Sequence, residues 1–290
     1  MTKTIRLTLI LSLTLVVLSA TLVAAEQPTL TWVYPDDSEP FAWVENGVPK
    51  GSEVEIVEKV FSRLGIKVNH KGYPWLRAMK MVELGEADMM MTTPNDGRFS
   101  YAIFGKEWTE VNFWTIYVKK GNAELKKKVE GFTRLDDLKQ YRLADFAGNG
   151  WQTSYMKQED GYNIAVQTAT IQQLPQVLAS GRVDMIINSE KSMDWNIEKL
   201  GLAGQIEKVN AELPGTRFHF VAMVSRKSPW AQKGIIRAFD EELKKVKQSG
   251  EWIQILKKYK DPHGLGKPFK TQINDSKYLA DYNNYPVYKP

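Results

Sequence analysis

Hydrophobic and polar positions alternate along the chain with two periods, and this alternation predicts its secondary structure. Apolar runs at residues 30–34, 66–73 and 87–91 are short enough to be strands. The segments between them, residues 52–64 and 75–84, carry apolar side chains every three or four positions, which is typical of amphipathic helices. This order of strand and helix is that of a parallel α/β sheet, so we predict an α/β fold.

The same pattern begins again after a polar break at residues 119–122. An apolar stripe at residues 171–178 predicts a helix that stops at Gly181, and residues 183–188 follow as an apolar strand. The first half contains the same order, because Gly85 ends a predicted helix just before the next strand. We therefore predict one α/β unit in each of two lobes.

The first 25 residues have the layout of a secretory signal peptide. Lys3 and Arg6 precede an apolar run at residues 7–17, and the sequence Val-Ala-Ala at 23–25 resembles a cleavage site. An uncleaved membrane anchor is the alternative, because weaker hydrophobicity continues to Ala25. The hydroxyl residues within the run favour cleavage, so we expect an exported mature chain.

The amino-acid composition limits the classes of protein to which this chain can belong. The chain of 290 residues contains no cysteine, so we expect neither a disulfide nor a lipoprotein anchor, and the core alone has to stabilise the fold. Together with export, this indicates a periplasmic location. The net charge is +5, and the lysines that contribute to it are spread over predicted helix faces. This distribution argues against nucleic acid as a partner.

The sequence lacks the common motifs of catalysis and cofactor binding. The three histidines, His70, His219 and His263, do not have the spacing of metal ligands. There is no nucleophile elbow and no phosphate-binding loop. We therefore expect no cofactor, no metal and no catalytic residue.

Several short motifs occur in an order and spacing that belong to a known family. They are Pro40-Phe41, residues 51–56, 85–88 and 181–184, the Thr93…Arg98 loop and the closing segment 250–259. In these motifs the chain resembles the family-3 extracellular (periplasmic) solute-binding proteins, which serve ABC uptake transporters for polar amino acids. The resemblance covers about residues 30–259.

This resemblance implies a type II periplasmic-binding-protein fold, in which two hinge strands join the lobes and the ligand lies in the cleft between them. We place the crossings at residues 117–120 and 222–226. The expected domains are lobe 1 (residues 26–118 and 224–260), lobe 2 (119–223) and a C-terminal tail (261–290). The implied function is capture of a small carboxylate-bearing polar ligand by hinge closure, as a monomer, for delivery to an ABC permease.

The loop after the strand at residues 87–91 is the first candidate binding site. Ligands of open α/β sheets bind at the carboxyl ends of strands, and this loop carries Thr93 and Arg98. The resemblance implies that Arg98 binds the α-carboxylate of the ligand. A guanidinium group is suited to this role because it can donate two parallel hydrogen bonds to a carboxylate. Thr93 is expected to add a hydroxyl or backbone donor.

The second lobe is expected to face this loop with the start of a helix. Asn149, Gly150 and Gln152 lie between the predicted strand at residues 142–145 and that helix. Backbone N–H groups at a helix start favour an anion, so these residues are predicted to contact the carboxylate from the other side.

Aromatic residues and one further arginine are candidates for the walls of the cleft. Trp43, Trp75 and Trp151 are expected to stack against an apolar or cationic part of the ligand. Arg77 is either a second anion contact or a solvated or inter-lobe arginine.

The position expected to bind the ligand ammonium departs from the family pattern. In amino-acid binders an aspartate follows the apolar strand of the second lobe, whereas Ser189 stands there in this chain, beside Asn188. Either Asp37 or Glu39 replaces that aspartate from lobe 1, or the ligand has no ammonium group. Asn188 is retained as a candidate contact through its amide.

Two other functions are compatible with the same fold. A sensory protein would present its closed form to a membrane receptor rather than to a permease. A cyclohexadienyl-dehydratase-like enzyme would need a carboxylate in the cleft, for which Asp37, Glu39 and Glu190 are candidates. We favour binding for transport over both.

Overall fold

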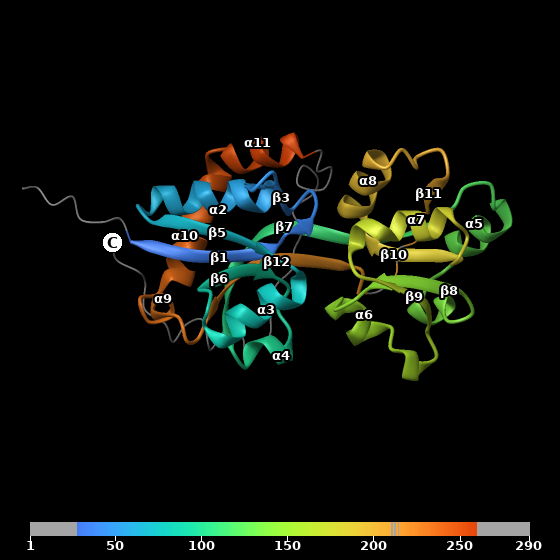
Figure 1. Cartoon of the computed structure of the whole chain (residues 1–290), viewed down its shortest axis with the longest axis horizontal. Helices are drawn as coiled ribbons and strands as arrows, with labels where there is room; N and C mark the ends of the chain where they lie inside the picture. The colour runs from blue at the N-terminus through green and yellow to red at the C-terminus, as the bar shows by residue number, and fades with distance from the viewer. Residues whose placement is uncertain (1–27, 210, 212, 214, 260–290) are drawn as a thin grey trace, which may run out of the picture.

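The computed structural model describes residues 28–209, 211, 213 and 215–259, so the predicted signal peptide and the tail at 261–290 lie outside the described residues. Two α/β lobes lie side by side, joined by the strands β7 (Ala102–Lys119) and β12 (Arg217–Ser225), as Figure 1 shows. Within the described part of the chain, no helix is both long and apolar enough to cross a membrane.

Lobe 1 is built on a sheet with the strand order β5–β1–β6–β12–β7. Its own strands are β1 (Thr29–Pro35), β5 (Lys67–Tyr73) and β6 (Met89–Thr92). Its helices are α2 (Ser52–Arg63), α3 (Trp75–Leu84), α4 (Asp96–Phe99), α9 (Pro229–Gln232), α10 (Ile235–Gln248) and α11 (Glu251–Lys258). Helices α2, α10 and α11 cover one face of this sheet, and α3 and α4 lie on the other (Figure 1).

The predicted apolar stripe of α2 forms part of the lobe 1 core. Val57, Val60 and Phe61 are fully buried, and they share one hydrophobic cluster with Trp32 of β1 and Phe239 of α10. Shortening a buried side chain of this kind to alanine costs about 2–5 kcal/mol. Such packing is how a chain without cysteine keeps its strand ends in place.

Lobe 2 has the strand order β11–β7–β10–β8–β9. Its strands are β8 (Arg142–Phe146), β9 (Asn163–Thr168), β10 (Met185–Ser189) and β11 (Ile206–Val209). Its helices are α5 (Ala123–Glu130), α6 (Gly150–Tyr155), α7 (Leu174–Ala179) and α8 (Glu190–Lys199), with short 3₁₀ turns η1 (Leu135–Leu138), η2 (Gln158–Asp160) and η3 (Ile171–Gln173).

Strand β7 belongs to both sheets, and it changes partners between Phe113 and Trp114. Its first part pairs with β12, from Ala102 opposite Ser225 to Phe113 opposite Arg217, and its last part pairs with β10 and β11. The two crossings therefore fall near residue 113 and just before Arg217, earlier than the sequence analysis placed them. We propose that the lobes divide at these two points.

Both sheets are mixed rather than purely parallel as predicted. Strands β1, β5 and β6 are parallel to one another, as are β8, β9 and β10. The joining strands, however, run antiparallel to their neighbours in each sheet. A chain that crosses between two lobes and returns has to run through the sheets in opposite directions, which the periodicity of single strands does not reveal.

A small antiparallel sheet follows β1 and comprises β2 (Asp37–Ser38), β3 (Ala42–Glu45) and β4 (Val48–Lys50). It places the segment after β1 against lobe 2, where Gln172 Nε2 donates to the Asp37 backbone carbonyl at 3.2 Å. Asp37 is thereby held at the edge of the space between the lobes.

Candidate functional site

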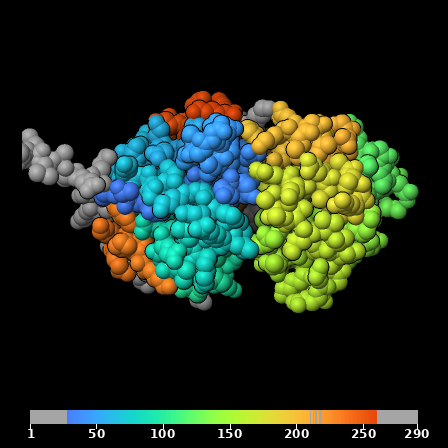
Figure 2. All heavy atoms as spheres, viewed as in Figure 1, coloured from blue at the N-terminus to red at the C-terminus, as the bar shows by residue number. Residues whose placement is uncertain are grey.

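A cavity of about 690 Å³ lies between the lobes, and Figure 2 shows the furrow that separates them on the surface. Lobe 1 lines the cavity with the segments after β1 and β6 and with the start of α3. Lobe 2 lines it with the β8–α6 loop, the segment after β9 and the end of β10. These are carboxyl ends of strands, where ligands of open α/β sheets bind.

Arg98 lies at the wall of this cavity and is almost entirely buried, with 8% of its surface exposed. Asn95 caps the start of α4 by accepting from the Arg98 backbone N–H at 3.0 Å. This turn lets Arg98 Nη1 donate to the backbone carbonyl and the hydroxyl of Thr93, at 2.6 and 3.0 Å. Burial lowers the pKa of the guanidinium from its usual range.

The β8–α6 loop of lobe 2 meets Arg98 and Trp75 across the cavity. A Cβ atom on Gly150 would lie 3.1 Å from Arg98 Nη2, so the guanidinium reaches the first residue of α6. The Trp75 indole N–H donates to the carbonyl of Gly148 at 2.9 Å, and Arg98 lies 5.5 Å from the Trp75 ring centre. The predicted pairing of the Arg98 loop with this helix start is thus present in the geometry.

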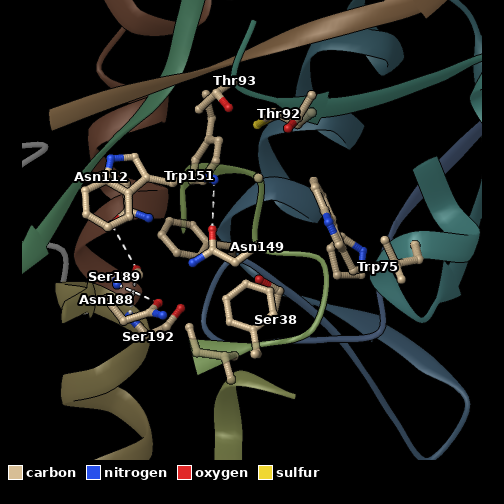
Figure 3. A pocket seen from close by; sticks show the side chains of 18 of the residues that line it. Ser38, Trp75, Thr92, Thr93, Asn112, Asn149, Trp151, Asn188, Ser189 and Ser192 are labelled. Carbon is tan, nitrogen blue, oxygen red and sulfur yellow. Dashed lines mark hydrogen bonds between the residues drawn. The ribbon is translucent and has the colours of Figure 1, made fainter. Parts of the chain in front are cut away.

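A network of amides around Asp145 forms the floor of the cavity on the lobe 2 side. Asp145 is 1% exposed and accepts from Asn149 Nδ2 at 2.7 Å and from Asn188 Nδ2 at 2.9 Å. The remaining amide oxygens accept from backbone N–H groups, Asn149 from Trp151 and Asn188 from Ser189 (Figure 3). Burial raises the pKa of Asp145 to about 7, and the hydrogen bonds it accepts oppose that rise.

Ser189, at the position where an aspartate was expected in an amino-acid binder, belongs to the same floor. Its hydroxyl is 2.9 Å from Asn112 Oδ1, and Figure 3 shows this pair on the opposite side of the cavity from Trp75. Both amide ends of Asn188 are engaged within the protein. The geometry therefore provides no carboxylate at the place where the sequence analysis found one missing.

Three acidic residues of lobe 1 line the cavity: Asp36, Asp37 and Glu53. Burial, and then the charge of Asp36, raises the pKa of Asp37 to about 6. Burial raises the pKa of Glu53 to about 8, and Glu53 accepts from the Trp32 indole N–H at 2.9 Å. Burial thus favours the neutral form of the Glu53 carboxyl group and, to a smaller extent, that of Asp37.

Trp151 lines the cavity as one half of a stacked pair. Its ring lies 5.1 Å from that of Trp114 at an interplanar angle of 10°. The Trp151 indole N–H donates to the carbonyl of Gly215 at 2.8 Å. The ring is thus held in place by the protein and offers an aromatic surface to the cavity.

Glu39 and Trp43 do not reach the cavity, although both were predicted to contact the ligand. Glu39 is 5% exposed and accepts from Lys199 at 2.7 and 2.9 Å. Trp43 packs between Trp195 of lobe 2 and Tyr259 of lobe 1. Both side chains instead hold the lobes together beside the cavity.

Arg77 and Gln152 are also directed away from the cavity. Arg77 lies over the Tyr73 ring at 4.6 Å, which matches the alternative of an arginine outside the site. Gln152 Nε2 donates to the carbonyl of Met156 at 2.7 Å, so its amide is used inside α6 and the segment after it. The predicted residues that do line the cavity are Asp37, Trp75, Thr93, Arg98, Asn149, Gly150, Trp151 and Asn188.

Several residues of the cavity wall were not predicted from the sequence. Asn112 and Trp114 flank the crossing in β7, Phe146 ends β8 and Tyr155 ends α6. Asp145, which lies beneath the wall, was not predicted either, although it stands near the carboxyl end of an apolar strand, which is a usable signal. Asn112 and Trp114 had no such signal, because they lie inside a strand of 18 residues.

A buried ion pair connects the lobes behind the cavity. Lys191 of α8 pairs with Glu110 of β7, and their side chains are 4% and 0% exposed. Ser52 donates to Glu110 Oε1 at 2.6 Å and lies 3.3 Å from Lys191 Nζ. Neither charged residue lines the cavity, so the pair joins the two lobes without forming part of the cavity wall.

Residues 30–262 match the family model described as bacterial extracellular solute-binding proteins, family 3. This chain belongs to that family. Over 168 residues it is 28% identical to the "Probable amino-acid-binding protein YxeM" of Bacillus subtilis. That match covers 57% of this chain and 61% of the relative, so it spans about three fifths of that protein.

Solved structures of other proteins share the architecture of this family member. One is a histidine kinase sensor domain with similarity to periplasmic binding proteins, with a TM-score of 0.68 and 17% identity, covering 80% of this chain and 95% of the other. Another is the arginine-, lysine-, histidine-binding protein ArtJ of Geobacillus stearothermophilus, with a TM-score of 0.64 and 19% identity, covering 83% and 97%. The fold is therefore the two-lobed type II periplasmic-binding-protein fold.

Proposed function

We propose that this family member captures a small carboxylate-bearing polar ligand, an amino acid or a related organic acid, between its lobes. It releases the ligand unaltered to the permease of an ABC transporter, and it works as a monomer in the periplasm. Membership of the solute-binding family supports binding over catalysis. The name of the Bacillus relative supports a ligand of the amino-acid type.

One observation carries the proposal, namely the environment of Arg98. Among the described residues that line the cavity, it is the one cation, and none of the described carboxylates forms an ion pair with it. A buried cation held by neutral groups is stabilised by an anionic ligand, and a guanidinium binds a carboxylate through two parallel hydrogen bonds. Gly150 lies beside it, so an anion there would contact both lobes.

Contact with both lobes is also what hinge closure requires. A ligand stabilises the closed form only by the affinity that it gains there over the open form. The change of partners in β7 near residue 113 and the return before Arg217 supply two adjacent strands about which the lobes can move. We therefore expect X-ray scattering to show a smaller radius of gyration when the ligand is added.

The test begins with mass spectrometry of the ligand released from the purified, denatured protein. Binding of that ligand to Arg98→Ala is then measured by calorimetry. We expect affinity to fall at least about ten-fold, because a charge-assisted pair contributes about 1.5–3 kcal/mol. Arg77→Ala is the matched control, since Arg77 lies over Tyr73 and outside the cavity, and it should bind normally.

Equal affinity of both variants would reject the assigned anion site. Release of a ligand without any anionic group would reject the proposed ligand class. Chemical conversion of the ligand during incubation with the protein would instead favour an enzyme.

A further inference from the structure

The cavity is larger than a free α-amino acid needs, which bears on the ligand of the proposed function. Its volume of about 690 Å³ equals that of roughly 23 water molecules in the liquid. A free aromatic amino acid has roughly a dozen non-hydrogen atoms and would fill about half of this space at one water volume per atom. The lobes already touch through Trp75 and Gly148, so this is the volume with the cleft drawn together.

Tryptophan side chains from both lobes define an aromatic part of the cavity. Trp75 comes from lobe 1, and Trp151, backed by Trp114, comes from lobe 2. The indole N–H groups of Trp75 and Trp151 both donate to backbone carbonyls, of Gly148 and Gly215. Because their polar atoms are satisfied and their rings are held, these side chains are suited to a flat apolar group.

The surroundings of Arg98 do not suit a free ammonium group next to the bound carboxylate. The nearby carbonyl and hydroxyl of Thr93 already accept hydrogen bonds from Arg98. On the lobe 2 side, the amides of Asn149 and Asn188 are bonded to Asp145 and to backbone N–H groups. An ammonium group packed against these groups of Thr93, Asn149 and Asn188 would be desolvated without a carboxylate among them, which is unfavourable.

An amide of the ligand, in contrast, has a partner. Asn112 lines the cavity, and its Oδ1 is within hydrogen-bonding distance of the Ser189 hydroxyl. Its Nδ2 makes no hydrogen bond with the described residues and is available to a carbonyl oxygen of the ligand. Asp36 and Asp37 line the same cavity from the segment after β1, where Asp37 contacts lobe 2 through Gln172.

We propose that the ligand is an α-carboxylate with a flat apolar side chain whose α-nitrogen is part of an amide. The carboxylate binds Arg98, the side chain lies against Trp75 and Trp151, and the amide carbonyl accepts from Asn112. A short peptide and an N-acyl amino acid both have this chemistry. In a peptide, the ammonium is displaced from the carboxylate and can reach Asp37.

The test compares three probes by calorimetry on the full exported chain, freed of bound ligand by unfolding and refolding. The probes are phenylalanine, N-acetylphenylalanine and glycylphenylalanine. We expect at least one of the two amides to bind about ten-fold or more tightly than phenylalanine. The variant Asp37→Asn distinguishes a peptide ligand from an N-acyl amino acid. It should weaken binding of glycylphenylalanine, which has an ammonium group, and leave binding of N-acetylphenylalanine unchanged.

Phenylalanine binding as tightly as both amides overturns the inference, and so does the absence of binding by all three probes. The proposed function survives either result if the ligand released from the purified protein is a carboxylate that depends on Arg98. The inference and the proposed function can therefore fail separately.

The aromatic contact is tested with Trp75→Leu and Trp75→Phe. The leucine variant should bind the preferred amide at least about five-fold more weakly, and the phenylalanine variant, which keeps a ring, should lose less. Trp43→Leu is the matched control, because Trp43 packs on Trp195 outside the cavity. Melting temperatures of all three variants show whether they fold. Equal affinities of Trp75→Leu and Trp43→Leu would overturn the aromatic contact.

Discussion

The two lobes contribute different chemistry to the cavity between them. Lobe 1 contributes its charged groups, namely Arg98 on one segment and Asp36 and Asp37 on another. Among the described residues, lobe 2 contributes neutral amides, hydroxyls and aromatic rings to the cavity lining, and the carboxyl group of Asp145 lies beneath the surface under Asn149 and Asn188. In the proposed binding mode, lobe 1 would therefore recognise the charge of the ligand, whereas lobe 2 would recognise its shape and polarity.

Under the proposed function, this division would let a charged ligand bind to lobe 1 before the lobes close. Ionic attraction acts over about 8–10 Å at physiological salt, whereas aromatic packing and neutral hydrogen bonds act only in contact. Under the proposed function, that ligand would then be enclosed by a lobe 2 surface that, among the described residues lining the cavity, carries no charged side chain. Three further experiments test parts of this comparison.

The largest effect on stability is expected at the buried ion pair behind the cavity, in which Lys191 of lobe 2 contacts Glu110 of lobe 1. Lys191→Met leaves Glu110 fully buried without its cation. Removing one partner of a buried pair costs about 3–5 kcal/mol, so the free energy of unfolding in urea should fall by that amount. Adding Glu110→Gln to the same variant should recover part of the loss.

The control is Lys128→Met, which breaks the exposed pair with Glu124. We expect no measurable change in its urea midpoint, because exposed pairs contribute little. A loss in Lys191→Met no larger than in this control would mean that the buried pair does not hold the lobes together.

A smaller, pH-dependent effect is expected at Asp145. Its pKa rises from the ordinary value of 3.8 to about 7 in the folded protein. Between these values the folded protein keeps a proton that the unfolded chain has lost, so this group makes stability fall as pH rises from about 4 to about 7. Asp145→Asn should reduce that fall by more than about 1 kcal/mol, measured by urea unfolding across this range.

Asp184→Asn serves as a control of opposite sign. Arg142 lowers the pKa of Asp184, so the stability that this residue contributes is lost as pH falls rather than as it rises. A fall in stability toward neutral pH that is as steep in Asp145→Asn as in the wild type would show that Asp145 is not the group responsible.

The smallest effect is expected from Gly150→Ala. The added methyl group would lie 3.1 Å from Arg98 Nη2 and would displace the guanidinium by a few tenths of an ångström. We expect roughly three- to ten-fold weaker binding of the native ligand by calorimetry and an unchanged melting temperature, because the methyl group acts on the anion site alone. Gly204→Ala, where an added Cβ meets no atom within 4 Å, should bind normally. Tighter binding by Gly150→Ala would contradict the proposed position of the carboxylate.

The residues that could be predicted at the cavity follow from strand ends. Thr93, Arg98, Asn149 and Gly150 stand just after apolar runs, and such runs end where an α/β sheet opens to ligand. Asn112 and Trp114 were missed because their place at the cavity depends on where β7 passes from one lobe to the other.

By itself, the sequence determined the α/β fold, the division into two lobes and the loops that carry the proposed anion site, because these depend on local periodicity and turn residues. The tertiary structure decided which polar side chains remain for a ligand. Glu39 accepts a hydrogen bond from Lys199, 160 positions away, and Asn188 donates one to Asp145, 43 positions away. Such pairings arise from the packing of distant strands and helices, and a hydrogen bond made inside the protein removes a group that the sequence alone would leave for the ligand.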